Sequence, residues 1–115
     1  MSGFLKDKFI RIRCRKAYHG AHNHVLIGRV VEETASYLAV YGKTFHFSRL
    51  FDGLKNQVLT GAVTTRIVPW SNIEIAHLQS GSVDFEADFG FDEQGNLVLH
   101  DAANTVIAER RDNLE

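Results

Sequence analysis

The chain has 115 residues, of which 44% are hydrophobic and 23% are charged, and it contains eight phenylalanines and three tyrosines. Domains typically hold about 100–150 residues, so one domain is expected, with room for an appendage. The apolar content excludes an intrinsically disordered chain. Thirteen Lys and Arg residues against fourteen Asp and Glu residues give a net charge of −1, which argues against a general polyanion binder.

Hydrophobic and polar residues alternate along most of the chain, which is typical of half-buried β-strands. In chain order, this pattern predicts strands at residues 9–16, 25–31, 37–47, 63–68, 73–78, 83–91, 97–100 and 105–109. Gly42 is expected to form a bend or a bulge within the third strand. A helical turn is expected around residues 3–7. A short helix or an irregular loop is expected at residues 48–61, where Ser48 is a competent N-cap.

The pattern predicts a mostly β protein in two parts. Residues 1–79 contain about five strands with residues 48–61 as an insertion, and closure into a small barrel would protect the strand edges. Residues 80–115 form an acidic, β-rich extension that is expected to fold as a three-stranded meander. The segment at 83–91 is the clearest amphipathic strand of the sequence.

Charge is distributed unevenly along the chain. Residues 1–16 contain six basic residues and one acidic residue, a net charge of +5. Residues 80–115 contain two basic and nine acidic residues, a net charge of −7. The residues between them carry a net charge of +1. Such an asymmetry indicates a charged partner or a charged tail.

The order and spacing of the first strands resemble a known family. A short N-terminal turn precedes the strand at 9–15, residues 25–31 turn into residues 37–40, and residues 66–75 hold a strand, a turn and a further strand. Over residues 4–78 the chain is similar to the Sm-like superfamily, which includes the Lsm and Hfq proteins. The resemblance implies a small, strongly bent five-stranded Sm-like barrel with an N-terminal helical turn, here followed by the C-terminal β-meander extension.

Individual positions match the family's motifs in part. Gly28 and Val30 match the Gly-x-Leu of the second strand. Thr34 and Leu38 stand where the first Sm motif has the Asp and the Asn that hold a uracil. In the second motif, Pro69-Trp70 replaces Arg-Gly, and Ile73 supplies the aliphatic residue. The resemblance therefore implies the barrel and not the family's standard uridine pocket.

Assembly is the second implication of the resemblance. Sm-like proteins form closed rings of about five to seven subunits, in which the fourth strand of one barrel pairs with the fifth strand of the next. Here those strands would be residues 63–68 and 73–78, both apolar and rich in β-branched residues. The chain's partner is therefore expected to be itself. The expected interface residues are Val63, Thr65, Ile67, Ile73 and Ile75.

The first strand carries a row of arginines that suits nucleic acid. Arg11, Arg13 and Arg15 share one strand face at a spacing of roughly 6.6 Å, which is close to the spacing of successive phosphates in an extended strand. Trp70, beside the lone proline, is a candidate stacking platform or interface anchor. The expected nucleic-acid-binding residues are Lys8, Arg11, Arg13, Arg15, Lys16 and Trp70.

The same basic row has an internal alternative. Asp84, Glu86 and Asp88 also share one face at the same spacing, so a cross-strand ladder of arginines and acids is equally compatible with the sequence. Both interpretations hold together if the acidic extension competes with RNA for the basic face.

Three histidines and one cysteine were considered for metal or redox chemistry. His19, His22 and His24 could ligate Zn, Ni or Cu, but a solvated polar loop explains them equally well, and no metal or cofactor is predicted. Cys14 cannot form an internal disulfide and alternates with apolar residues as a small core residue.

Neither catalysis nor a membrane is expected. The sequence has no nucleophile elbow, phosphate loop or dinucleotide fingerprint, and no membrane-length apolar run, so a cytoplasmic non-enzyme is predicted. The leading functional hypothesis is a Sm-like ring protein that binds RNA or single-stranded nucleic acid. The alternative is a homo-oligomeric structural or adaptor protein that uses the barrel for assembly without nucleic acid.

Overall fold

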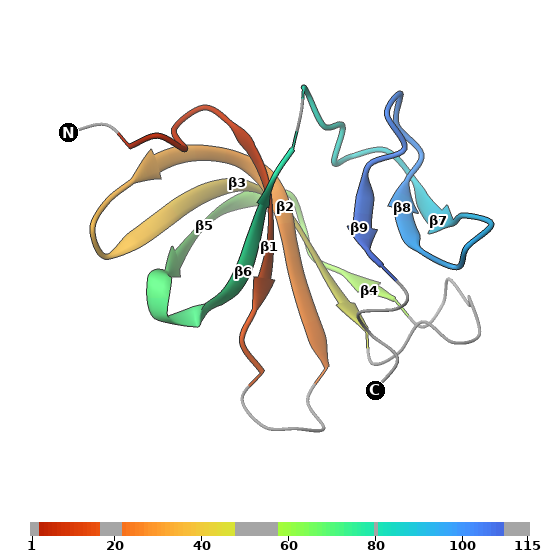
Figure 1. Cartoon of the computed structure of the whole chain (residues 1–115), viewed down its shortest axis with the longest axis horizontal. Helices are drawn as coiled ribbons and strands as arrows, with labels where there is room; N and C mark the ends of the chain where they lie inside the picture. The colour runs from red at the N-terminus through yellow and green to blue at the C-terminus, as the bar shows by residue number, and fades with distance from the viewer. Residues whose placement is uncertain (1–2, 17–21, 48–57, 80, 110–115) are drawn as a thin grey trace.

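A computed structural model describes residues 3–16, 22–47, 58–79 and 81–109. These residues form a mostly β protein with two antiparallel sheets, as the alternating pattern predicted (Figure 1). No helix among the described residues is long and apolar enough to cross a membrane.

The first sheet has six strands, and β3 is shared by three neighbours. Its main order is β4-β3-β2-β1-β6, and β5 pairs with the first half of β3 while β4 pairs with the second half. The strands are β1 (Phe9–Cys14), β2 (Asn23–Glu33), β3 (Tyr37–Phe47), β4 (Leu59–Thr60), β5 (Thr64–Pro69) and β6 (Ile73–Leu78). The sequence predicted the bounds of β3 and β6 correctly, and β2 is longer than expected at both ends.

The sheet bends strongly but stays open. A three-residue 3-10 helix, η2 (Trp70–Asn72), joins β5 to β6. Nevertheless, within the described residues β5 pairs with β3 and β6 pairs with β1, and no ladder joins β5 to β6. The prediction that this sheet closes into a barrel is therefore not met within one copy of the chain.

Two local expectations were wrong. Phe4–Asp7 is a hydrogen-bonded turn and not a helical turn, and it ends at Asp7, whose φ is 68°. The register runs without a break through Gly42, and the bulge of the β2–β3 pair lies between Val30 and Glu32 instead. The helix considered at residues 48–61 is a strand at its described end, Leu59–Thr60, while residues 48–57 lie outside the described part.

The second sheet is the expected three-stranded meander. It has the order β7-β8-β9, with β7 (Phe89–Phe91), β8 (Leu97–Leu99) and β9 (Val106–Ala108). The amphipathic strand predicted at 83–91 exists only in its last three residues. Asp84 accepts hydrogen bonds from the backbone N–H groups of Glu86, through its side chain, and of Ala87, through its carbonyl, so a turn forms here instead of a strand.

Opposite faces of the first sheet bury two separate cores. The inner face of the bend holds a cluster with Ile10, Ile12 and Cys14 from β1, as alternation predicted. The second sheet packs on the other face, where Val25 and Ile27 of β2 contact a core shared with β8 and β9. On β1 this second face presents the odd-numbered residues, including two of the predicted arginines.

Candidate functional site

A pocket of about 350 Å³ lies where the first sheet meets the edge of the second. The second sheet shares its core with the β2 and β3 part of the face, and the pocket lies between β9 and the adjoining part of that face on β1 and β6. It is lined by Arg11, Arg13, Val25, Glu74, Ile75, His77, Ile107, Ala108 and Glu109. This volume is at the lower end of the ~300–1,000 Å³ range of small-molecule sites.

Strand register explains why the two arginines and the apolar walls meet. Arg11 lies opposite His77 of β6, and Arg13 lies opposite Ile75, so all four side chains share one face of the sheet. On the other side of β1, Arg13 lies opposite Val25 of β2. Apolar residues therefore flank the arginines on this face.

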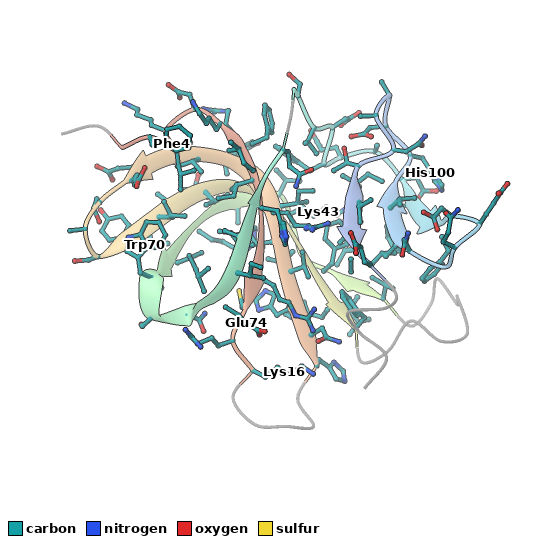
Figure 2. All side chains as sticks on the ribbon, viewed as in Figure 1. Phe4, Lys16, Lys43, Trp70, Glu74 and His100 are labelled. Carbon is teal, nitrogen blue, oxygen red and sulfur yellow. The ribbon has the colours of Figure 1, made fainter. Side chains whose placement is uncertain are left out.

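Glu74 reaches the pocket because of a bulge. The register of the β1–β6 pair shifts between Arg13 and Cys14, whose partners are Ile75 and Ile73, so Glu74 has no partner of its own. Strict alternation would have sent Glu74 to the face opposite Ile75, yet both residues line the pocket. A bulge of this kind re-aims one side chain without breaking the strand. Figure 2 shows Glu74 on β6.

Hydrogen bonds hold both arginines in place. The Nη1 of Arg11 donates to the carbonyl oxygen of Val106 on β9 at 2.9 Å, and the Nη2 of Arg13 donates to Oδ1 of the buried Asn23 at 2.9 Å. Both arginines are half-buried. The first bond joins the two sheets, since Val106 belongs to the second sheet and Arg11 to the first.

The formal charge of the pocket is balanced. Arg11 and Arg13 contribute two positive charges, and Glu74 and Glu109 contribute two negative charges. His77 is exposed at the same site. A balanced lining offers donors and acceptors together and does not concentrate one sign of charge, so it suits a neutral polar ligand better than an anion.

The other predicted nucleic-acid residues lie elsewhere. Arg15 is exposed, and its Nε donates to the carbonyl oxygen of Ser71 at 3.0 Å, beside η2. Lys16 is half-buried just beyond the end of β1 (Figure 2). Lys8 lies before the start of β1, with its Nζ 4.9 Å from the centre of the Phe4 ring. The structure thus brings only Arg11 and Arg13 into one pocket.

Trp70 serves packing in the described structure. Its Nε1 donates to the carbonyl oxygen of Thr34 at 2.8 Å, and its side chain packs against the inner core cluster. The indole therefore ties η2 to the turn between β2 and β3.

The cross-strand ladder of arginines and acids does not form. The neighbours of β1 are β2 and β6, and Asp84 to Asp88 are not in a strand. Asp84, Glu86 and Asp88 are all exposed.

The predicted interface residues lie along two strand edges. Thr65 and Ile67 on β5 and Ile75 on β6 are exposed, whereas Val63 and Ile73 are half-buried. Ile73 also packs against the inner core. In the described part of the chain, each of β5 and β6 pairs along one side only.

The histidine cluster differs from the predicted one. His19 lies outside the described residues and His22 is exposed, while His24 stacks on His46 across the β2–β3 pair at a ring distance of 4.0 Å. The Nε2 atom of His24 is buried without a hydrogen-bond partner. Among the residues that the structure describes, no group of three or more His, Cys, Asp or Glu side chains could hold a metal ion.

Both stacked imidazoles are shifted towards the neutral form. Burial lowers the pKa of His24, and the charges of His46 and Arg66 lower it further. Burial likewise lowers the pKa of His46, with added effects of His22 and Arg66.

Sequence reasoning missed Glu74, His77, Ile107 and Glu109 as pocket residues. Alternation does place His77 on the same face of its strand as Ile75, but no local signal shows which face β9 will approach. The bulge that turns Glu74 inwards is likewise a property of the paired strands.

Comparison of the chain with protein-family models, with curated proteins and with solved structures gave no match.

Proposed function

We propose that this chain is a Sm-like assembly module whose copies join edge to edge into a closed ring of about five to seven subunits, and that the ring binds RNA or single-stranded nucleic acid. One observation carries the proposal. The strand order β5-β3-β2-β1-β6 ends in two strands that are each paired on one side only within the described residues.

The two edges have the chemistry of strands that pair with another chain. Ile67 on β5 is 59% exposed, and Ile75 and Leu78 on β6 are 47% and 49% exposed. Exposed apolar edge strands invite pairing or aggregation, and natural proteins normally cover or charge them. Pairing of β5 in one copy with β6 in the next would cover both edges.

Such a contact is head-to-tail, since two different strands meet. Repetition of a head-to-tail contact gives a ring when the rotation closes, which abolishes every exposed edge. The short η2 connection supports this arrangement because it holds the two edges of one copy close together at one end. The open sheet of a single copy would then be completed by its neighbours.

A ring would also multiply weak cationic contacts. One copy has a net charge of −1, yet its N-terminal 16 residues carry +5. A ring presents this segment about five to seven times, so contacts too weak in one copy act together on one strand of nucleic acid. Arg15, exposed at the end of β1, is the cation we expect to contact phosphate.

Light scattering after size-exclusion chromatography tests the assembly. The expected mass is about five to seven times the 13.0 kDa of one copy. Ile67→Lys places a charge on the β5 edge and should reduce the mass to that of one copy, while Ala102→Lys, in an exposed turn, should leave the ring intact. A wild-type chain that elutes as a single copy at high concentration would contradict the proposal.

Fluorescence anisotropy with uridine-rich and adenine-rich oligomers at low salt tests the nucleic-acid function. We expect binding whose salt dependence decreases by about one unit of slope when Arg15 is replaced by Gln. No anisotropy change at low salt would exclude this part of the proposal.

A structural or adaptor function is the second candidate, and one observation favours it. The most regular cations of the sequence, Arg11 and Arg13, are half-buried and bonded to Val106 and Asn23. A ring that purifies with the absorbance ratio of pure protein and binds neither oligomer would support the adaptor function.

A further inference from the structure

We propose that the pocket between β1, β6 and β9 binds a single guanine base. The inference rests on the proposed nucleic-acid function, since the base would belong to a bound strand. It concerns a site formed partly by β9, in the C-terminal extension.

The charge balance of the pocket selects the class of ligand. Two guanidinium groups and two carboxylates line the same space, so a phosphate attracted by Arg11 and Arg13 would be repelled by Glu74 and Glu109. A neutral ligand that donates on one side and accepts on the other meets no such conflict. The walls formed by Val25, Ile75, Ile107 and Ala108 suit the flat apolar faces of a base.

Among the bases, guanine has the matching edges. Its O6 and N7 atoms are adjacent acceptors, and the pairing of these atoms with arginine is the commonest specific base contact in protein–DNA complexes. Its N1–H and N2–H₂ groups are adjacent donors, which correspond to the two oxygens of a carboxylate. Adenine offers one amino group and uracil one N–H, so neither matches both kinds of lining group as fully.

The structure holds the required groups ready. The bonds of Arg11 to Val106 and of Arg13 to Asn23 fix both side chains before any ligand arrives. The β6 bulge brings Glu74 into the pocket, where regular alternation would have turned it away. Bulges recur beside binding sites for this reason, and the aliphatic residues of the same lining have no need of one.

Isothermal titration calorimetry with the whole chain tests the inference directly. The probes are guanosine, inosine, adenosine and inorganic phosphate. Guanosine should bind at least tenfold more tightly than inosine, which lacks only the N2 amino group, since that loss leaves a carboxylate oxygen without a donor. Phosphate should neither bind nor displace guanosine.

Variants connect the binding to the pocket. Glu74→Gln keeps the size of an exposed side chain, and guanosine binding should weaken about tenfold while the melting temperature is unchanged. The matched control is Glu93→Gln, at an exposed position of the β7–β8 hairpin, which should bind guanosine like the wild type. If Glu74→Gln folds and binds guanosine unchanged, the inference is wrong.

Oligomers separate this inference from the proposed function. A short uridine oligomer with one central guanosine should bind the ring more tightly than the same oligomer without it. If both oligomers bind equally and guanosine alone does not bind, the pocket inference fails and the nucleic-acid function stands. If guanosine binds but neither oligomer does, the pocket inference stands and the nucleic-acid function fails. Binding of inorganic phosphate in place of guanosine would identify an anion site and overturn the inference.

Discussion

Gly28 of β2 and Gly42 of β3 lie directly opposite each other, and neither position has room for a side chain. A Cβ atom on Gly28 would collide with the carbonyl oxygen of Tyr41, and one on Gly42 would collide with the carbonyl oxygen of Ile27. Both obstacles are backbone atoms, which cannot rotate away. The two long strands therefore cross in close contact at this glycine pair, within the strongly bent sheet.

Replacing Gly42 with alanine should destabilise the fold. The added methyl group would push β2 and β3 apart in the middle of the sheet, and we expect a loss of about 3 kcal/mol in the free energy of unfolding. Urea denaturation followed by fluorescence of Trp70 measures the loss. Ala102→Ser, which enlarges an exposed side chain, is the control and should unfold like the wild type. An equally stable Gly42→Ala variant would show that the strands separate easily here.

The stacked pair of His24 and His46 should make the protein sensitive to acid. Both pKa values are lowered in the folded state, first by burial, so below pH 6.5 the unfolded chain binds more protons than the folded one. The contribution to stability is complete above about pH 6.5 and is lost as the pH falls through the lowered pKa values.

Urea midpoints at pH 7.5 and 5.0 test this expectation. His24→Phe keeps an aromatic ring and removes the buried Nε2 atom, so the variant should lose much less stability between the two pH values than the wild type. His100→Gln, at an exposed position, should retain the full wild-type loss. Identical pH dependence in the wild type and His24→Phe would exclude the histidine pair as its source.

Asp101 should stabilise the second sheet through its carboxylate. Burial alone would raise its pKa, but hydrogen bonds from Thr105, Asp84 and Ala103 outweigh this effect and lower the pKa below 3.8. The bonds include one of 2.7 Å from the Thr105 hydroxyl to Oδ2. This contribution is present above about pH 4 and is lost as the pH falls through the lowered pKa.

Replacing Asp101 with asparagine tests the carboxylate at neutral pH. The amide lacks one acceptor oxygen and all charge, so we expect a loss of about 1–2 kcal/mol in the free energy of unfolding at pH 7 and little difference at pH 3. Glu93→Gln is the control for removal of a surface charge. A difference that persists unchanged at pH 3 would rule out the charge of Asp101 as the cause.

Two edge variants should complement each other when mixed. Ile67→Lys blocks the β5 edge and leaves β6 intact, while Leu78→Lys blocks the β6 edge and leaves β5 intact. If the contact is head-to-tail, an equimolar mixture should form a heterodimer through the two intact edges, although neither variant associates alone. Light scattering of the mixture measures this. A contact that joins identical edges would give dimers of each variant separately and no gain on mixing.

Trp70 should support the fold without contacting nucleic acid. Trp70→Phe removes the indole hydrogen bond to the carbonyl oxygen of Thr34, and we expect a loss of about 1 kcal/mol in stability with unchanged oligomer binding. Circular dichroism and fluorescence anisotropy measure the two effects. Loss of a stacked base would instead weaken binding by about 1–3 kcal/mol. Phe4→Leu, which alters an exposed aromatic residue, is the control.

The sequence by itself determined the strands and the faces of β1. Alternation has the same two-residue period in the sequence as in a strand, so Ile10, Ile12 and Cys14 could be assigned to one face and Arg11 and Arg13 to the other. It also predicted the bounds of β3 and β6 and the meander of the second sheet. It failed at residues 84–88, because the Asp84 side chain and carbonyl bond to nearby backbone N–H groups, and hydropathy does not register such a turn.

Only the tertiary structure decided what the two charged rows do. The net charge of −1 combines a basic and an acidic segment of similar spacing, and the sequence allowed them to pair. Pairing is set by which strands become neighbours, and β1 lies between β2 and β6. Arg11 therefore meets β9 through the carbonyl oxygen of Val106, and Glu74 enters the same pocket through a bulge. Both events depend on contacts between distant segments, which no local pattern encodes.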